Sequence, residues 1–459
     1  MADDTRDGSG NDPGPSSCSP PVETSHDAAD IVANEKRNIL SLSLHFVCLR
    51  LGWIFKTETV IMPAFLDTIA GAGWLRGCLP VLNRIGSSLP PLLYAPRLRN
   101  AGRKKWTLMG ATLLMALPFF VLAVTWFSID QSRRPGWLPV LFLTCYTICF
   151  VGTGLNRLAF ATVQGKLIRD NRRGRLMLIS GLLGSLVAVT CSVILFPRWL
   201  GLPDHGFGWI FLVTAGGFIA AGLSAGFIAE PADVVGTERP RPRQVFHAAW
   251  RLFWDNPAFR RIAVVGMLFI SVQLAFPHYQ KLGRIHLDDA DEGLHLMYWV
   301  VAQNIGFGVF SIVFGRIADS RGNRLAIRIQ IFLLAAVPLV AILLASPLVR
   351  DGGRLFWIPF SFLGLTPLTC RTINNYVLEL APPSEHPRYI STLSLAMAVP
   401  FVVAPFVGLL VDLIGFPPVF VGVSVIVALG GLMTIGMSEP RRDEHLEETP
   451  PIGCPGTLQ

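Results

Sequence analysis

The chain has 459 residues, of which 51% are hydrophobic and only 15% are charged, and its mean hydropathy is +0.50. Ordinary soluble domains carry about 25% charged residues, so this composition excludes a soluble globular protein. The formal charge of +8 lies mostly in short loops between apolar runs, which is typical of membrane topology and not of nucleic-acid binding. The eight cysteines have no paired spacing, so we expect no disulfide framework, no metal site and no cofactor.

The amino-terminal segment is polar, with acidic residues scattered among glycine, serine and proline. It predicts a disordered acidic cytoplasmic tail over residues 1–38, and not a signal peptide, which would begin with basic residues before an early apolar core. After this tail, twelve apolar runs are long enough to cross a bilayer, which needs about 20 residues each. They lie near residues 39–62, 75–94, 106–128, 137–160, 176–196, 207–229, 262–282, 294–314, 325–346, 355–378, 390–413 and 417–437.

These runs predict an all-α membrane protein with twelve transmembrane helices in two pseudo-symmetric six-helix halves. We expect the halves to comprise residues 39–230 and 262–437, joined by a cytoplasmic linker at 231–261, with a second cytoplasmic tail at 438–459. Lysine and arginine are enriched in cytoplasmic loops. With the amino terminus in the cytoplasm, the inner connections carry far more of these residues than the outer ones. We therefore expect a multi-pass protein of the inner or plasma membrane with both termini in the cytoplasm.

The linker between the halves contains a predicted amphipathic helix. Phe246, Ala249, Trp250 and Phe253 follow helical i, i+3, i+4, i+7 spacing, with basic residues nearby. A helix of this kind is expected to lie on the inner membrane surface. A partly ordered linker is the alternative.

The connection between the eighth and ninth runs is a tight, charged turn from Gly315 to Arg324. We expect Gly315 to permit close helix approach and Gly322 to permit the turn, while the arginines favour the cytoplasmic side. The stretch resembles the Gly-x-x-x-Asp-x-x-Gly-x-Arg signature of the major facilitator superfamily, with Asp319 at the acidic position. The resemblance covers residues 39–437, through the number of spans, the loop lengths and this motif.

The corresponding loop of the first half, Ala95–Lys104, departs from the signature. Ala95 replaces the first glycine and Arg99 replaces the aspartate. In the superfamily this aspartate helps to latch the two halves in one state, so the resemblance leaves the latch of the first half in doubt. It implies a gating role for Asp319, together with Arg321, facing the start of a span in the opposite half.

Polar side chains inside the apolar runs are the candidates for function, because such groups are costly in a membrane and usually face a cavity or one another. In the superfamily, spans one, four, seven and ten line a central cavity. The candidates for a substrate site are Arg50, Lys56, Glu58, Arg84, Asn156, Arg157, Gln273, Gln303, Asn304, Arg371, Asn374 and Asn375. Hydrogen bonds between packed helices for the asparagines of span ten, and a reach to the interface for Arg157 and Arg371, are the alternatives.

Two carboxylates, Glu58 and Glu379, are candidates for proton coupling, because a buried carboxylate is the usual proton carrier. Lys56 and Glu58 are two residues apart and point in nearly opposite directions on a straight helix. We therefore expect each of them to find its partner in another span.

Cationic groups outnumber carboxylates among these candidates, which favours an anionic or strongly hydrogen-bonding solute. We expect a secondary active or facilitative transporter, driven by H+ or Na+ or by the gradient of the solute itself. The superfamily resemblance also implies a monomer. The alternative is a non-transporting membrane protein of similar fold that acts as a sensor or as an assembly or delivery factor. The chain contains no phosphate-binding loop and no cluster of catalytic residues, so we expect no enzyme.

Overall fold

The computed structural model describes residues 25–130, 135–200, 202, 206–232, 242–287, 292–382 and 385–438, and all regular elements in these ranges are helical. The first half contributes α1 (Ser25–Phe55), α2 (Ile61–Ile69), α3 (Gly73–Arg99), α4 (Lys105–Ser128), α5 (Leu138–Leu167), α6 (Asp170–Leu200) and α7 (Gly206–Gly226). The rest contributes α8 (Pro242–Asp255), α9 (Pro257–Ile270), α10 (Phe276–Arg284), α11 (Glu292–Arg321), α12 (Asn323–Leu344), α13 (Trp357–Leu363), α14 (Leu365–Leu380), α15 (His386–Ala396), α16 (Ala404–Ile414) and α17 (Phe416–Met433). Short 3-10 helices lie at η1 (Ser271–Ala275), η3 (Gly352–Leu355), η5 (Val399–Val403) and η6 (Thr434–Gly436).

Ten helical stretches of the described residues are long and apolar enough to cross a membrane. Two further segments run beside them, α3 and the bent pair α13–α14, which are less apolar because they contain residues such as Arg84 and Arg371. Together they occupy the twelve runs that the sequence predicts. The all-α membrane fold expected from the sequence is confirmed.

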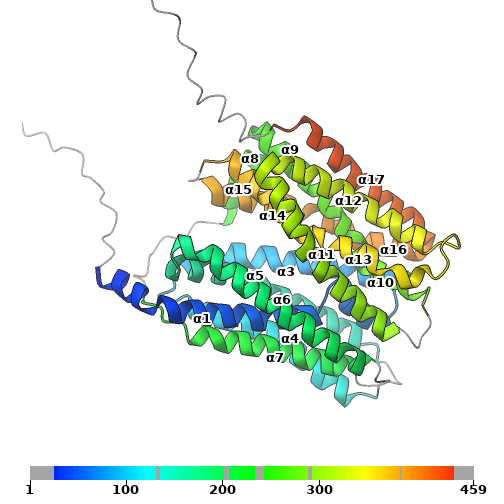
Figure 1. Ribbon diagram of the computed structural model, residues 1–459, viewed down its shortest axis with the longest axis horizontal. Coiled ribbons are helices and arrows are strands. Elements are labelled where there is room, and N and C mark those ends of the chain that lie inside the picture. The colour runs from blue at the N-terminus through cyan, green and yellow to red at the C-terminus, as the bar shows by residue number, and fades with distance from the viewer. Residues whose placement is uncertain are drawn as a thin grey trace, which may run out of the picture.

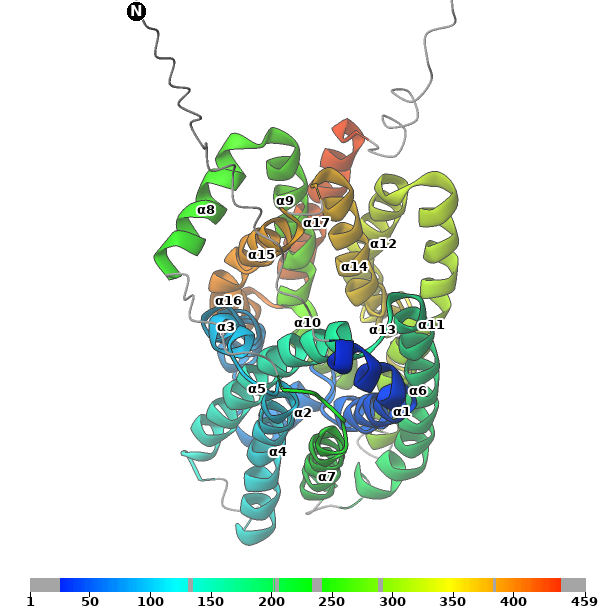
Figure 2. The ribbon, with the colours of Figure 1, turned by 90° about the vertical axis from the view of Figure 1, so that its left-hand side faces the viewer.

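The helices form two bundles that lie side by side (Figure 1). Helices α1 to α7 pack on one another in the first bundle, and α9 to α17 in the second, with α8 resting on α15 and α9. Viewed along the helices, the two bundles face each other across α3, α6, α11 and α16 (Figure 2). These four helices therefore form the boundary between the bundles.

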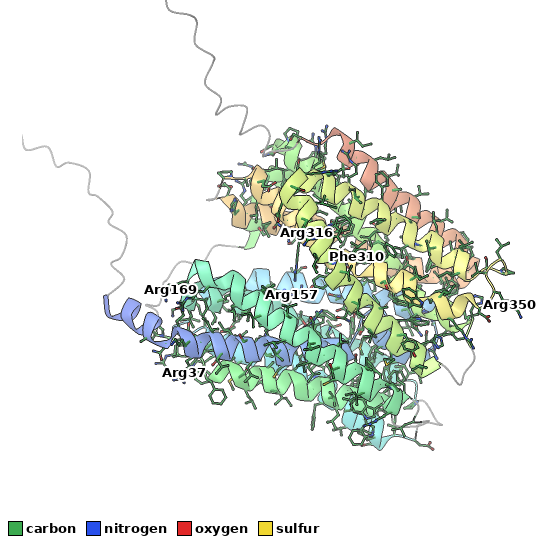
Figure 3. The ribbon with its side chains drawn as sticks, in the orientation of Figure 1. Arg37, Arg157, Arg169, Phe310, Arg316 and Arg350 are labelled. Atoms are coloured by element: carbon green, nitrogen blue, oxygen red, sulfur yellow. The ribbon has the colours of Figure 1, made fainter. Side chains whose placement is uncertain are left out.

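The two ends of the molecule differ in charge, and we name them accordingly. The basic end holds Arg37 and Arg169, and the opposite end holds Arg350 (Figure 3). Gly73 and Asp412 also lie at the opposite end, where α3 begins and α16 ends. At the basic end, Glu230 accepts hydrogen bonds from the backbone N–H groups of Lys104 and Lys105, at 3.0 and 2.7 Å.

The first helix begins earlier than the sequence predicts. Residues 1–24 of the expected tail lie outside the described residues, but α1 starts at Ser25 rather than near residue 39. Glu35 of this segment is held by partners in another helix. It is 2% exposed and forms ion pairs with Arg169 and Arg172, at 2.6 and 2.8 Å. Because these pairs satisfy its buried carboxylate, the helix can include this polar residue. The tail at 439–459 also lies outside the described residues.

The charged turn is built as expected at Gly322 but not at Gly315. Gly322 has φ of +89°, a conformation that favours glycine, and it separates α11 from α12. A Cβ at Gly315 would meet no atom within 4 Å, so the expected close approach is wrong at this position. α11 instead approaches a neighbouring segment closely at Gln303, where a Cβ added to Gly364 would lie 2.5 Å from the carbonyl oxygen of Gln303.

Candidate functional site

The two bundles are fastened to each other at the opposite end. Asp412 of α16 accepts a hydrogen bond from the backbone N–H of Gly73, at 2.6 Å, and lies 3.6 Å from the guanidinium of Arg76. Arg76 also pairs with Asp67 of its own bundle, and its side chain is 3% exposed. Gly408 lies so close to Gly73 that a Cβ there would overlap the neighbouring backbone. Charge pairing and small residues thus close this end.

Further contacts join the bundles toward the middle of the membrane. The hydroxyl of Thr59 donates to Oε1 of Gln303 at 2.5 Å, and Nη2 of Arg50 donates to Oδ1 of Asn304 at 3.0 Å. Arg84 of α3 donates to the carbonyl oxygen of Ser394 in α15, also at 3.0 Å. Arg50, Arg84, Gln303 and Asn304, all predicted from the sequence, therefore lie at the boundary between the bundles.

At the basic end, the acidic residues bind within their own bundle. Glu230 pairs with Lys166 at 3.1 Å in the first bundle, and Glu379 accepts a hydrogen bond from Asn323 at 2.8 Å in the second. Asp319, the expected gating residue, is exposed and has no hydrogen bond or ion pair among the described residues. No latch through Asp319 is formed in this conformation.

Two arginines show that solvent reaches the interior from the basic end. Arg157 lies ten residues before the end of α5 and Arg371 nine before the end of α14, which places both roughly 14 to 15 Å from that end at 1.5 Å per residue. Both side chains are nevertheless exposed. Figure 3 shows Arg157 between the two bundles. Solvent therefore reaches the space between the bundles around these two arginines, while the contacts of Asp412 join the bundles at the opposite end. We call this space the cavity.

Span one is broken beside this cavity, which corrects the prediction that Lys56 and Glu58 do not pair with each other, while the expected partner of Glu58 in another span is present as Asn83 of α3. α1 ends at Phe55, so both residues lie in a turn rather than on a helix, and their side chains converge. Nζ of Lys56 lies 3.2 Å from Oε1 of Glu58, and Nδ2 of Asn83 donates to the other carboxylate oxygen. Lys56 is fully buried, and its ammonium lies 3.5 Å from the ring centroid of Trp53. The lysine is thus neutralised by a partner on its own span.

Four arginines of the cavity lie on aromatic rings. Arg50 and Arg371, which come from different bundles, lie 6.0 and 5.3 Å from the ring centroid of Phe307. The other two contacts are those of Arg157 with Trp53, at 5.9 Å, and of Arg84 with Phe401, at 5.7 Å. Aromatic faces attract cations, so these rings hold the guanidinium groups without neutralising them.

The four guanidinium groups are close enough to interact electrostatically. The charge of Arg371 acts on Arg50 and on Arg157, and the charge of Arg157 acts on Arg84. The thiol of Cys370 lies within the fields of Arg84, Arg157 and Arg371. Glu58 attracts Arg157, but its ion pair is with Lys56. Within the described residues, no acidic side chain forms an ion pair with any of the four arginines.

The remaining predicted residues occupy different places. Asn156 is 3% exposed and donates to the hydroxyl of Thr112 at 2.7 Å inside the first bundle, where it also contacts His45. It therefore belongs to helix packing and not to the cavity lining, which corrects the sequence prediction. Gln273 is half-buried in η1, Asn374 is half-buried in α14, and Asn375 beside it is exposed.

Sequence reasoning missed the pairing of Arg76 with Asp67 in its own bundle and with Asp412 of the other bundle at the opposite end. It also missed the aromatic partners of the arginines. Phe307 and Trp53 lie in a sequence with many other aromatic residues in its apolar runs, so the sequence does not identify these two as partners of the arginines.

Comparison with known proteins identifies the family. A family model described as the Major Facilitator Superfamily matches residues 59–370. The chain belongs to the Major Facilitator Superfamily. The resemblance drawn from the charged turn is thereby confirmed, and superfamily membership agrees with the expectation that the chain is not an enzyme.

Solved structures of superfamily transporters share the fold. A mutant of the nucleoside transporter NupG aligns with a TM-score of 0.66 at 12% identity, covering 87% of this chain and 99% of that one. A POT family transporter in complex with 5-aminolevulinic acid aligns with a TM-score of 0.63 at 14% identity, covering 87% and 95%. At such low identity the likeness concerns the fold alone.

Among curated proteins, the chain is similar to uncharacterized proteins of Mycobacterium tuberculosis and Mycobacterium bovis. Each is 24% identical over 248 residues, which is 52% of this chain and 44% of the relative. The chain thus matches a little under half the length of these relatives.

Proposed function

We propose that this protein is a secondary transporter that moves a small anionic or polar solute across the membrane by alternating access. The observation that carries the proposal is the exposure of Arg157 and Arg371 deep between two bundles that are fastened together at the opposite end. Charged groups at membrane depth mark solute pathways. A cavity closed at one end and open at the other is one of the two states that alternating access requires.

The charge of the cavity supports an anionic solute. Four guanidinium groups face one carboxylate, Glu58, which Lys56 already neutralises. The solute would bind near Arg50, Arg157 and Arg371, with Asn304 and Gln303 as hydrogen-bonding groups and Asn374 and Asn375 further along α14.

We further propose that the basic end faces the cytoplasm of a plasma or inner membrane, following the enrichment of lysine and arginine there. The protein would act as a monomer, and the six-helix halves would comprise residues 39–230 and 262–437. Closing the basic end would bring Asp319 toward the start of α6, with Arg321 and Arg324 in the same motif.

Glu58 is the proposed site of proton coupling. It is 27% exposed, so solvent reaches it, and it accepts hydrogen bonds from Lys56 and Asn83. Protonation would weaken both bonds and release the positive charge of Lys56 in the wall of the cavity. Glu379, which is bound by Asn323 nearer the basic end, is the second candidate.

Ligand-induced thermal stabilisation of the purified protein tests the proposal, since a ligand that binds only the folded state raises its stability. The panel comprises organic anions, sugars, peptides and lipophilic cations, and each hit is then assayed for uptake into proteoliposomes. We expect stabilisation and uptake of an anion or polar solute, both strongly reduced in Arg371→Ala and Arg50→Ala. Arg350→Ala, which removes the same charge from an exposed position at the opposite end, is the matched control.

Stabilisation by a solute that never enters proteoliposomes would favour a sensor over a transporter. If uptake by the Arg371→Ala and Arg50→Ala variants is as fast as uptake by the Arg350→Ala variant, the assignment of the cavity is wrong.

A further inference from the structure

The charge of the cavity specifies more than an anion. The charges of four guanidinium groups, those of Arg50, Arg84, Arg157 and Arg371, act on one another between the bundles. The hydrogen bonds of Arg50 to Asn304 and of Arg84 to the backbone of Ser394 do not reduce this charge. A single negative charge would leave most of this charge uncompensated. We propose that the cavity binds an organic solute with at least two negative charges, and that the protein exchanges one such anion for another. This inference rests on the proposed transport function and deepens it.

The placement of the arginines fits two anionic groups. Arg50 and Arg371 come from opposite bundles, and both guanidinium carbons lie within 6.0 Å of the ring centroid of Phe307. Arg84 and Arg157 lie on two different rings, Phe401 and Trp53, and the charge of Arg157 acts on Arg84. One anionic group can bind between Arg50 and Arg371, and the other beside Arg84 and Arg157. A solute held in this way joins the two bundles.

The aromatic rings favour a solute with a flat or apolar part between its anionic groups. Trp53 and Phe307 are half-buried, and each lies beside guanidinium groups that can bind carboxylate or phosphate oxygens in pairs. Guanidinium forks of this kind suit carboxylates and phosphomonoesters equally. The proposed class is therefore an organic dicarboxylate or phosphomonoester, with the rings in contact with its carbon skeleton.

The same charge explains why exchange is expected. When the basic end closes, the cavity loses its contact with solvent, and uncompensated charges become strongly unfavourable in the lower dielectric. Arg371 already acts on Arg50 and Arg157 while the cavity is open. A bound dianion offsets two of the four positive charges, which weakens this repulsion and lets the bundles close. The empty protein closes slowly, so the return half of the cycle needs a second anion.

Binding is tested with phthalate, which carries two carboxylates, and with benzoate, which has the same ring and one carboxylate. Phenyl phosphate supplies a second dianion of different shape. We expect the dissociation constants of the dianions, from thermal stabilisation of the purified protein, to be at least about tenfold lower than that of benzoate. Arg371→Gln and Arg50→Gln should reduce this ratio toward one, whereas Arg350→Gln should preserve it. Equal binding of benzoate and both dianions would overturn the inference.

A second readout does not depend on any ligand. Cys370 is half-buried and lies within the fields of three of the arginines. A methanethiosulfonate converts its thiol to a mixed disulfide and releases methanesulfinate, and this product can be followed by peptide mass spectrometry. We expect an anionic methanethiosulfonate to modify Cys370 several-fold faster than a cationic one of equal size, with the preference lost in Arg371→Gln. Cys191, which lies in α6, serves as the internal reference. Faster modification by the cationic reagent would contradict a cationic cavity.

Exchange is tested in proteoliposomes loaded with phthalate or with neutral sucrose, to which labelled phthalate is added outside. We expect uptake into phthalate-loaded vesicles to be at least about tenfold faster than into sucrose-loaded vesicles. Equal rates would refute obligatory exchange. Uptake of a neutral solute or a cation, without dianion binding, would overturn this inference but leave the transport proposal intact. Dianion binding without any uptake would support the proposed class of ligand but would overturn both the exchange and the transport proposal.

Discussion

The contact between Asp412 and the first bundle makes a sharp prediction about conformation. Asp412→Asn keeps the size of the side chain but removes its charge. The hydrogen bond from the backbone N–H of Gly73, now 2.6 Å, becomes a bond between neutral groups, and the attraction to Arg76 at 3.6 Å is lost. Both interactions join the bundles at the opposite end, so the substitution should favour the state in which that end is open.

The size of the effect follows from the two interactions. A hydrogen bond to a charged group contributes about 1 kcal/mol more than a neutral one, and a partly exposed ion pair contributes about 0.5 kcal/mol. Asp412 is 37% exposed, so the smaller value for the pair applies. The sum, about 1.5 kcal/mol, corresponds to about a tenfold increase in the ratio of open to closed molecules.

The assay is a distance measurement between nitroxide labels at Leu202→Cys and Leu348→Cys, which are exposed positions of different bundles at the opposite end. The population with the longer distance should increase about tenfold in Asp412→Asn. Asp351→Asn is the matched control, because it removes a carboxylate from the same end without touching the first bundle. If both variants give the distance distribution of the unmodified protein, Asp412 does not hold this end closed.

Three further predictions concern other parts of the chain. Glu58→Gln should abolish the pH dependence of uptake, and uptake that stays fully pH-dependent would remove Glu58 as the proton carrier. Gly364→Ala should destabilise the protein by about 1–3 kcal/mol through overpacking against the backbone of Gln303, measured as a lower melting temperature, with Gly308→Ala, which has open space, as the control. Trp250 and Trp254 are 66% and 52% exposed on α8, so brominated lipids should quench their fluorescence if α8 lies on the membrane; unchanged fluorescence would place α8 in water.

The sequence was a good guide to the fold, because membrane spans are specified by length and hydropathy. Each apolar run must form a helix to satisfy its backbone, and this rule needs no knowledge of partners. The glycine of the charged turn is a similar case, since Gly322 adopts the left-handed conformation that the motif requires. The early start of α1 was not visible, because it depends on ion pairs of Glu35 with residues more than a hundred positions away.

The site was only partly predictable. The arginines were found because charges are conspicuous in apolar runs, but the direction of each side chain depends on how helices rotate against their neighbours. Asn156 shows this limit, since it lies next to Arg157 in sequence and yet points into its own bundle. The pairing of Lys56 with Glu58 was missed because helical geometry was applied across a point where the helix has ended.

The break in span one divides that span between two partners. α1 packs on α6 and α7 of the first bundle, whereas α2 also packs on α10 of the second. If the bundles separate at the opposite end, α1 and α2 move by different amounts, and the backbone between Phe55 and Ile61 must change conformation to allow this. Lys56 and Glu58 sit on this joint, bonded to each other across it. The proposed protonation of Glu58 would therefore act on the freedom of the joint as well as on the charge of the cavity.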